Sequence, residues 1–120
     1  MIRAIKLYNT PDGGSAFVEG TVPELEQLQV EHVIFQATAP QATYALHPAP
    51  RRQYVITLKG RLEFIVTDGS IFILGPGDVL LATDVHGSGH SWRTLEGDGW
   101  ERLYAVLRPG APDGFTPLVP

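Results

Sequence analysis

The chain has 120 residues, a formal net charge of −4 and no cysteine. That length fits one domain with its own core, and the acidic balance gives no electrostatic reason to expect nucleic acid or an anionic membrane as a partner. Without cysteine there is no disulfide, thiolate nucleophile or cysteine-bound metal. No apolar stretch approaches the ~20 residues that span a bilayer, and residues 1–6 lack a signal-peptide core. We therefore expect a cytoplasmic globular protein.

The first third of the chain predicts strands separated by loops. Residues 2–8 alternate loosely between apolar and polar side chains, and 9–14 have the composition of a loop. Residues 22–28 form the only stretch that permits a helix, and it is too short for more than one or two turns. Residues 29–36 predict a further strand, which a loop follows at 37–41.

The centre of the chain has the clearest strand signals. Residues 54–58 and 62–66 are rich in β-branched and aromatic side chains and flank Gly60. The pair Asp68-Gly69 precedes another apolar run at 71–74, which predicts a hairpin with a type I′ turn. The turn residues Gly75-Pro76-Gly77-Asp78 then end this predicted strand.

The last third continues the pattern. Residues 79–82 predict a strand, and 92–95 and 100–107 predict a final hairpin around the turn at 96–99. Residues 109–120 are a Pro/Gly-rich tail without periodicity, so we place the domain at 1–108. Many short strands at this spacing indicate an all-β sandwich or barrel with antiparallel strands.

Residues 47–60 resemble the first sequence motif of the cupin family, approximately G-x5-H-x-H-x3-E-x6-G. The first histidine of that motif aligns with His47 and its closing glycine with Gly60. Its opening glycine, second histidine and glutamate fall on Gln41, Ala49 and Gln53.

Residues 69–84 resemble the second motif, approximately G-x5-P-x-G-x2-H-x3-N. Its two glycines align with Gly69 and Gly77, while its proline, histidine and asparagine fall on Gly75, Leu80 and Asp84. The stretch from His47 to Tyr54 and the close Gly87-Ser88-Gly89-His90 are similar to a subgroup of small single-domain cupins. The resemblance implies a single-domain cupin jelly-roll β-barrel.

Three of the four metal ligands of the family are replaced, by Ala49, Gln53 and Leu80. An amide oxygen is a weaker ligand than a carboxylate, and the other two side chains offer no donor. We therefore predict no firmly bound cofactor. If a divalent metal (Fe, Mn, Zn or Ni) does bind, we expect its ligands among His47, Gln53, His86 and His90.

A homodimer is a second expectation from the resemblance. Apolar strands at both ends of the domain, 2–7 and 103–107, would be open pairing edges in an isolated barrel.

Strand alternation suggests which side chains share a pocket. If the segment is a regular strand, His47, Ala49, Arg51 and Gln53 lie on one face, which in a barrel is the interior. An arginine there would offer a fixed fork of donors for a carboxylate or phosphate, but the sequence leaves open whether Arg51 or Arg52 takes that role. The aromatic residues Tyr54 and Trp92 flank these segments and could line the same pocket.

The stretch from Asp84 to His90 is either a connecting loop or a means of orienting an imidazole for proton transfer. Two functions are thus open. The first is a protein that binds a small molecule in a polar pocket of His, Gln and Arg side chains. The alternative is a small-molecule enzyme (an isomerase, epimerase, cyclase or lyase, with or without a metal) that uses His47 or His90 as acid or base.

Overall fold

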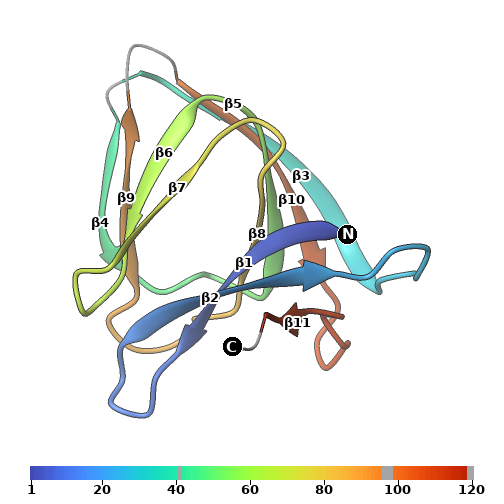
Figure 1. The fold of residues 1–120 in the computed structure, drawn as a ribbon. Helices are drawn as coiled ribbons and strands as arrows, with labels where there is room; N and C mark the ends of the chain where they lie inside the picture. The colour runs from blue at the N-terminus through green and yellow to red at the C-terminus, as the bar shows by residue number, and fades with distance from the viewer. Residues whose placement is uncertain (41, 96–98, 119–120) are drawn as a thin grey trace.

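In a computed structural model of the chain, residues 1–40, 42–95 and 99–118 are described, and they form two β-sheets (Figure 1). The larger sheet has the strand order β11-β2-β1-β8-β5-β10-β3, and the smaller sheet has the order β4-β9-β6-β7. The strands are β1 (Ile2–Asn9), β2 (Ser15–Val22), β3 (Val30–Thr38), β4 (Thr43–His47), β5 (Gln53–Lys59), β6 (Arg61–Ile65), β7 (Ile71–Leu74), β8 (Val79–Ala82), β9 (His90–Leu95), β10 (Trp100–Leu107) and β11 (Thr116–Pro117).

The chain crosses repeatedly from one sheet to the other. Strands β4, β6, β7 and β9 belong to the smaller sheet, whereas β5, β8 and β10 belong to the larger one. This alternation wraps both sheets around a shared interior and confirms the all-β jelly-roll prediction. One pair departs from the expected antiparallel arrangement, because β1 and β8 run parallel over three residue pairs from Ile5 to Leu7.

Gly60 is the point where the chain turns from β5 into β6. Its φ is +104°, and a Cβ atom at this position would lie 2.2 Å from the carbonyl oxygen of Gly99. Only glycine fits such a corner, because the left-handed backbone and the close approach both exclude a side chain. The corner is what places 53–59 and 61–65 in different sheets.

Two local predictions need correction. The expected final hairpin is wrong, since β9 pairs with β4 and β6 whereas β10 pairs with β3 and β5; its turn residues 96–98 lie outside the described residues. The hairpin between β6 and β7 is confirmed, but its turn is not type I′. Gly69 has a positive φ and Asp68 has not, and the amide of Gly69 bonds the carbonyl of Val66.

The main core fills the space between the sheets. Strands alternate their side chains, so each contributes every second residue to this interior. The buried members are Leu7, Val55, Leu62, Phe64, Val66, Phe72, Leu74, Leu80, Trp92 and Trp100.

A second apolar cluster lies on the other face of the larger sheet and is covered by the C-terminal tail. Tyr54, Leu81 and Leu107 are its buried members, and Phe115 packs against them. The tail also forms β11, which pairs with β2, and Lys6 and Asp113 make an ion pair of 3.0 Å. The segment after residue 108 is therefore an ordered cover for the sheet, apart from 119–120, which lie outside the described residues.

The apolar strands that were expected to be open edges are interior strands. β1 lies between β2 and β8, and β10 lies between β5 and β3, so neither has a free side. The outermost strands of the two sheets are β3, β11, β4 and β7. In the part of the chain that the structure describes, no helix is long and apolar enough to cross a membrane.

Candidate functional site

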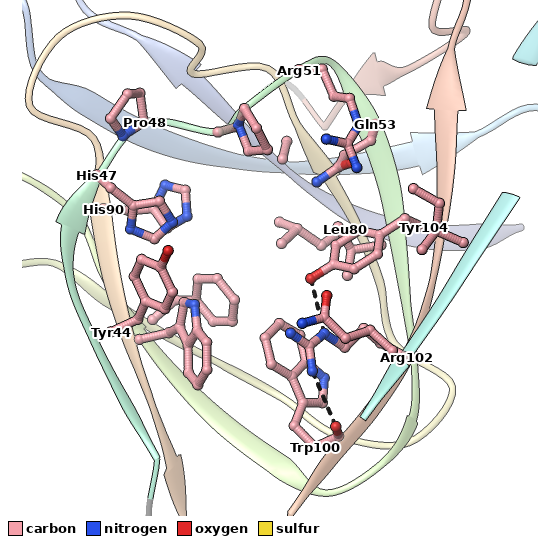
Figure 2. Close-up of a pocket in the computed structure, with 18 residues that line it drawn as sticks. Tyr44, His47, Pro48, Arg51, Gln53, Leu80, His90, Trp100, Arg102 and Tyr104 are labelled. Atoms are coloured by element: carbon pink, nitrogen blue, oxygen red, sulfur yellow. Dashed lines mark hydrogen bonds between the residues drawn. The ribbon is translucent and has the colours of Figure 1, made fainter. Parts of the chain in front are cut away.

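A pocket of about 330 Å³ opens between the two sheets. Its walls come from β3, β5, β8 and β10 on one side, from β4, β6 and β9 on the other, and from the connection between β4 and β5. Figure 2 shows His47 and His90 together on one side and Arg51, Gln53 and Arg102 across from them. The volume suits a small metabolite, because ligand pockets typically measure roughly 300–1,000 Å³.

The segment from His47 to Gln53 supplies one end of the pocket. It is not one regular strand, because β4 ends at His47 and β5 begins at Gln53. His47, Ala49, Arg51 and Gln53 nevertheless all line the pocket, as the alternation predicted. The amide of Ala49 donates to the carbonyl of Asp84 at 2.9 Å, which fixes this connection against the β8–β9 loop.

Arg51, not Arg52, faces the pocket. Arg52 instead donates through Nη2 to the carbonyl oxygen of Ala111 at 2.6 Å, on the side of the sheet that the tail covers. Among the described residues Arg51 has no hydrogen-bond or carboxylate partner, and its Nε is buried without one. The sequence alone could not separate the two arginines, because the prolines 48 and 50 interrupt the strand register.

Tyr54 does not line the pocket, which corrects the expectation for this residue. Its side chain belongs to the cluster under the tail, and its hydroxyl donates to the carbonyl oxygen of Asp113. Burial, with the nearby Asp113 carboxylate, raises the pKa of Tyr54 to about 12. Tyr54 follows Gln53 directly in a strand, so it points to the opposite face.

His90 is held by a buried carboxylate. Its Nδ1 lies 2.6 Å from Oδ2 of Asp84, and both side chains are almost fully buried. The Ser15 hydroxyl donates to the same oxygen at 2.8 Å, while Oδ1 of Asp84 has no partner among the described residues. A carboxylate that accepts Nδ1–H fixes the ring tautomer and orientation, which leaves Nε2 as the nitrogen available to the pocket.

His47 lies next to His90, with 5.0 Å between the two ring centroids. Its Nδ1 is 2.8 Å from the carbonyl oxygen of Ala45, and the ring of Tyr44 is 4.0 Å away between centroids. The predicted pair of histidines is thus brought together. His86 is not part of this group: it is exposed, and its backbone bonds the side chain of Asn9.

The four positions that the cupin resemblance assigns to metal ligands do meet in one pocket. His47, Ala49, Gln53 and Leu80 all line it. Two of the four have hydrocarbon side chains, and no group of three or more His, Asp or Glu side chains is placed to hold a metal ion within 1–40, 42–95 and 99–118. Two imidazoles and an amide do not match the usual three-ligand catalytic site, so these residues do not fit a tightly held metal.

Arg102 is the charged pocket residue that sequence reasoning missed. It is only 3% exposed, and its guanidinium carbon lies 3.9 Å from the centroid of the Trp100 ring. Its Nε donates to the hydroxyl oxygen of Tyr104, and its Nη1 donates to Thr38 and to the carbonyl of Trp100. Nη2 has no hydrogen-bond partner among the described residues, and no carboxylate among them pairs with the guanidinium. The missed signal is the alternation in β10, which puts this arginine on the inward face with Trp100 and Tyr104.

Aromatic rings form the floor of the pocket. Trp92 lines it as predicted and packs edge-on against Trp100, with 4.9 Å between ring centroids. The Tyr44 ring stacks on Trp92 at 5.5 Å, and Phe64 approaches Trp100 at 5.9 Å. The floor is apolar while the walls carry donors, a combination that is typical of small-molecule sites.

Comparison with known proteins gives the fold its name. No protein-family model matches the chain, and no curated protein matches it significantly. A conserved protein with a double-stranded β-helix domain from Klebsiella pneumoniae superposes with a TM-score of 0.52 at 18% sequence identity, over 84% of each chain. The chain has a cupin fold.

Two other solved structures are also similar. A cupin superfamily protein from Desulfitobacterium hafniense has a TM-score of 0.46 at 14% identity, over 72% of this chain and 94% of that one. KdgF from Halomonas sp. has a TM-score of 0.48 at 18% identity, over 85% and 86%. At such identities the likeness concerns the cupin fold and not the activity.

Proposed function

We propose that the protein binds a small molecule with a carboxylate group in the pocket between its two sheets. The observation that carries this proposal is Arg102, a buried guanidinium without a carboxylate partner among the described residues. A buried charge is costly unless it is both hydrogen-bonded and paired with an opposite charge. A ligand carboxylate at the free Nη2 would provide that compensation.

The surroundings of Arg102 support an anionic ligand. The Trp100 ring and three hydrogen bonds hold the guanidinium in one orientation, so little conformational entropy is lost when a ligand binds. Arg51 adds a second cation without a carboxylate partner. The Tyr104 hydroxyl accepts from Arg102, which leaves its own proton for a ligand oxygen.

Calorimetric titration tests this proposal. A panel of small hydroxy and keto carboxylic acids is compared with the corresponding neutral amides, and we expect binding of acids only. Arg102→Gln should weaken binding roughly 10- to 100-fold, the loss of one charge-assisted hydrogen-bonding group. Arg93→Gln is the matched control, because Arg93 is an exposed arginine paired with Glu63 away from the pocket. Equal binding of acids and amides would contradict the proposal.

A second variant, Arg102→Lys, guards against the possibility that Arg102→Gln fails to fold. It keeps the positive charge but loses the fork of guanidinium donors. We expect it to have the wild-type melting temperature within a few degrees and an affinity between those of wild type and Arg102→Gln. A Lys variant that is folded and binds no worse than wild type would count against a guanidinium-specific contact.

Proton transfer is a second candidate function, favoured by the Asp84–His90 pair. An imidazole whose Nδ1 is held by a buried carboxylate is arranged to act as a base through Nε2. With the carboxylate of a ligand bound at Arg102, the carbon next to it could lose a proton to His90. The reaction class would be isomerisation or epimerisation.

Deuterium exchange distinguishes catalysis from binding alone. Each acid that binds is incubated with the protein in D₂O, and loss of the proton next to the carboxyl or keto carbon is followed by NMR. If the pair is catalytic, Asp84→Asn should slow exchange at least about 100-fold while affinity stays within a few-fold. Binding without any exchange in the wild type would leave the protein a binder and rule out this reaction for the acids tested.

A further inference from the structure

Strand β3 (Val30–Thr38) is a long, open edge. It lies at one end of the larger sheet and pairs with β10 on one side only, without a partner strand on the other among the described residues. The other outer strands are much shorter: β11 has two residues, β7 four and β4 five. Since free backbone donors and acceptors attract other strands, proteins usually shorten an edge or protect it with charge or proline.

None of these protections is present along β3. The strand has nine residues and no proline, and its only ionisable side chains are Glu31 and His32. Its only irregularity is a register shift at its first residues, opposite Val106 and Leu107 of β10. The remaining backbone from His32 to Thr38 is regular and open.

The outer face of β3 is also apolar. Val33 is 49% exposed and Phe35 is 69% exposed. Phe35 lies opposite Leu103 of β10, which in turn lies opposite Ile56 of β5, so apolar side chains continue across three strands. An apolar row that ends at an open edge is a surface that a further strand would extend.

We propose that β3 pairs antiparallel with β3 of a second copy of this chain, around a two-fold axis at Ile34. Ile34 is the middle residue of the strand, so this register lets all nine residues pair. It places Val33 opposite the second copy's Phe35 and Phe35 opposite the second copy's Val33. Apolar side chains then meet on the outer face, where each such pair stabilises a sheet.

Charge also fits a second copy in this register. The single acidic residue, Glu31, faces the second copy's Ala37, so no like charges are opposed. A shift of the axis by one residue to Val33 would place Glu31 opposite Phe35 instead. The strand is thus self-complementary about Ile34, which is the requirement for a two-fold interface between identical chains.

The pairing would also complete the ligand pocket. Ile34 and Gln36 are inward-facing residues of β3 and line the pocket. In the proposed register, the second copy's Ile34 lies next to Ile34, and the second copy's His32 lies next to Gln36. In the single chain the pocket wall ends at β3. The second copy's β3 would therefore extend this wall.

Cysteine cross-linking is the sharpest test, because the chain has no cysteine of its own. Directly opposed residues in an antiparallel pair have Cα atoms about 4.5–5.5 Å apart, within the range that a disulfide spans. Ile34→Cys should therefore give a covalent dimer under mild oxidation. Leu58→Cys is the control: this residue is 51% exposed but lies on β5, two strands from the edge.

Light scattering gives the second measurement. We expect wild type at about 100 μM to have twice the 13.1 kDa mass of one chain. Phe35→Glu should give the single-chain mass, because the new carboxylate would face the second copy's Val33, whereas Leu58→Glu should remain a dimer. The proposal is overturned by a monomeric wild type, by a dimer that survives Phe35→Glu, or by cross-linking of Leu58→Cys in place of Ile34→Cys.

Discussion

Arg51 and Arg52 are neighbours in the chain and serve opposite sides of the larger sheet. Arg51 lines the pocket between the sheets, whereas Arg52 reaches the carbonyl oxygen of Ala111 in the C-terminal tail. The same short connection thus carries one cation that faces the pocket and one anchor for the tail.

Replacing each arginine by alanine should separate these two roles. Arg51→Ala is expected to weaken carboxylate binding about tenfold and to change the free energy of unfolding little. Arg52→Ala should leave affinity unchanged and destabilise by about 1.5–3 kcal/mol, the worth of one hydrogen bond from a charged donor. Calorimetry and urea unfolding of both variants check this. Interchanged effects would show that the side chains are placed the other way round.

The tail contact of Tyr54 predicts a loss of stability in alkali. The pKa of this phenol is raised to about 12 in the folded chain from an ordinary value of 10.0, so folding favours the neutral form. The contribution is fully present below pH 10 and is lost as pH rises toward 12, by roughly 2 kcal/mol at most. Urea unfolding at pH 9 and pH 11.5 should show this loss in wild type and a smaller one in Tyr54→Phe. An equal loss in both proteins would disprove the assignment.

The same contact between the sheet and the tail predicts a loss of stability in acid, through the carboxyl group of Asp113. Burial alone would raise the pKa of this carboxyl, but the Phe115 amide, the Lys6 ammonium and Arg52 together lower it. Its contribution to stability is therefore present above the ordinary pKa of 3.8 and is lost as pH falls below it. Asp113→Asn should reduce the difference in unfolding free energy between pH 6 and pH 3. Lys6→Gln is the partner control and should have a similar effect.

Much of the fold could be predicted because its signals are local. The pair Asp68-Gly69 predicts a hairpin independently of the rest of the chain. The alternation through His47, Arg51 and Gln53 likewise predicted which side chains form one wall of the pocket. The assignment of strands to sheets is not local: 92–95 and 100–107 have the sequence of a hairpin, yet each finds better partners in a different sheet. Only the packing of distant strands decides that choice.

The candidate site was predicted in part for the same reason. His47 and His90 come from segments with distinctive sequences, whereas Arg102 lies in a strand of ordinary apolar alternation. Its importance depends on what surrounds it, namely the Trp100 ring and the lack of a carboxylate partner in the described chain. That Asp84 orients His90 was one of two interpretations the sequence left open for this loop, and the structure places the two side chains 2.6 Å apart.

The backbone at Gly89 should be the least tolerant position near the site. Its φ is +78°, and a Cβ there would lie 1.9 Å from the carbonyl oxygen of His47. Gly89→Ala therefore combines left-handed strain with a backbone clash that would separate His90 from His47. Gly69→Ala is the control, since its φ is +89° with open space around it, and it should cost only about 1 kcal/mol. Thermal unfolding of both variants should rank Gly89→Ala as clearly the more destabilised, and equal losses would contradict the close approach.

The ligand positions of the cupin resemblance predict a low metal content for this protein. His47 and His90 supply imidazoles and Gln53 an amide oxygen, while Ala49 and Leu80 supply nothing, so no anionic side chain helps to hold a dication against water. We expect untagged protein to contain Fe, Mn, Zn or Ni well below one equivalent and to lose it readily to a chelator. His47→Ala should have the same low content, and wild-type affinity for carboxylic acids should survive chelation. Near-stoichiometric metal that disappears in His47→Ala would contradict this and would make His47, Gln53 and His90 the first ligands to examine.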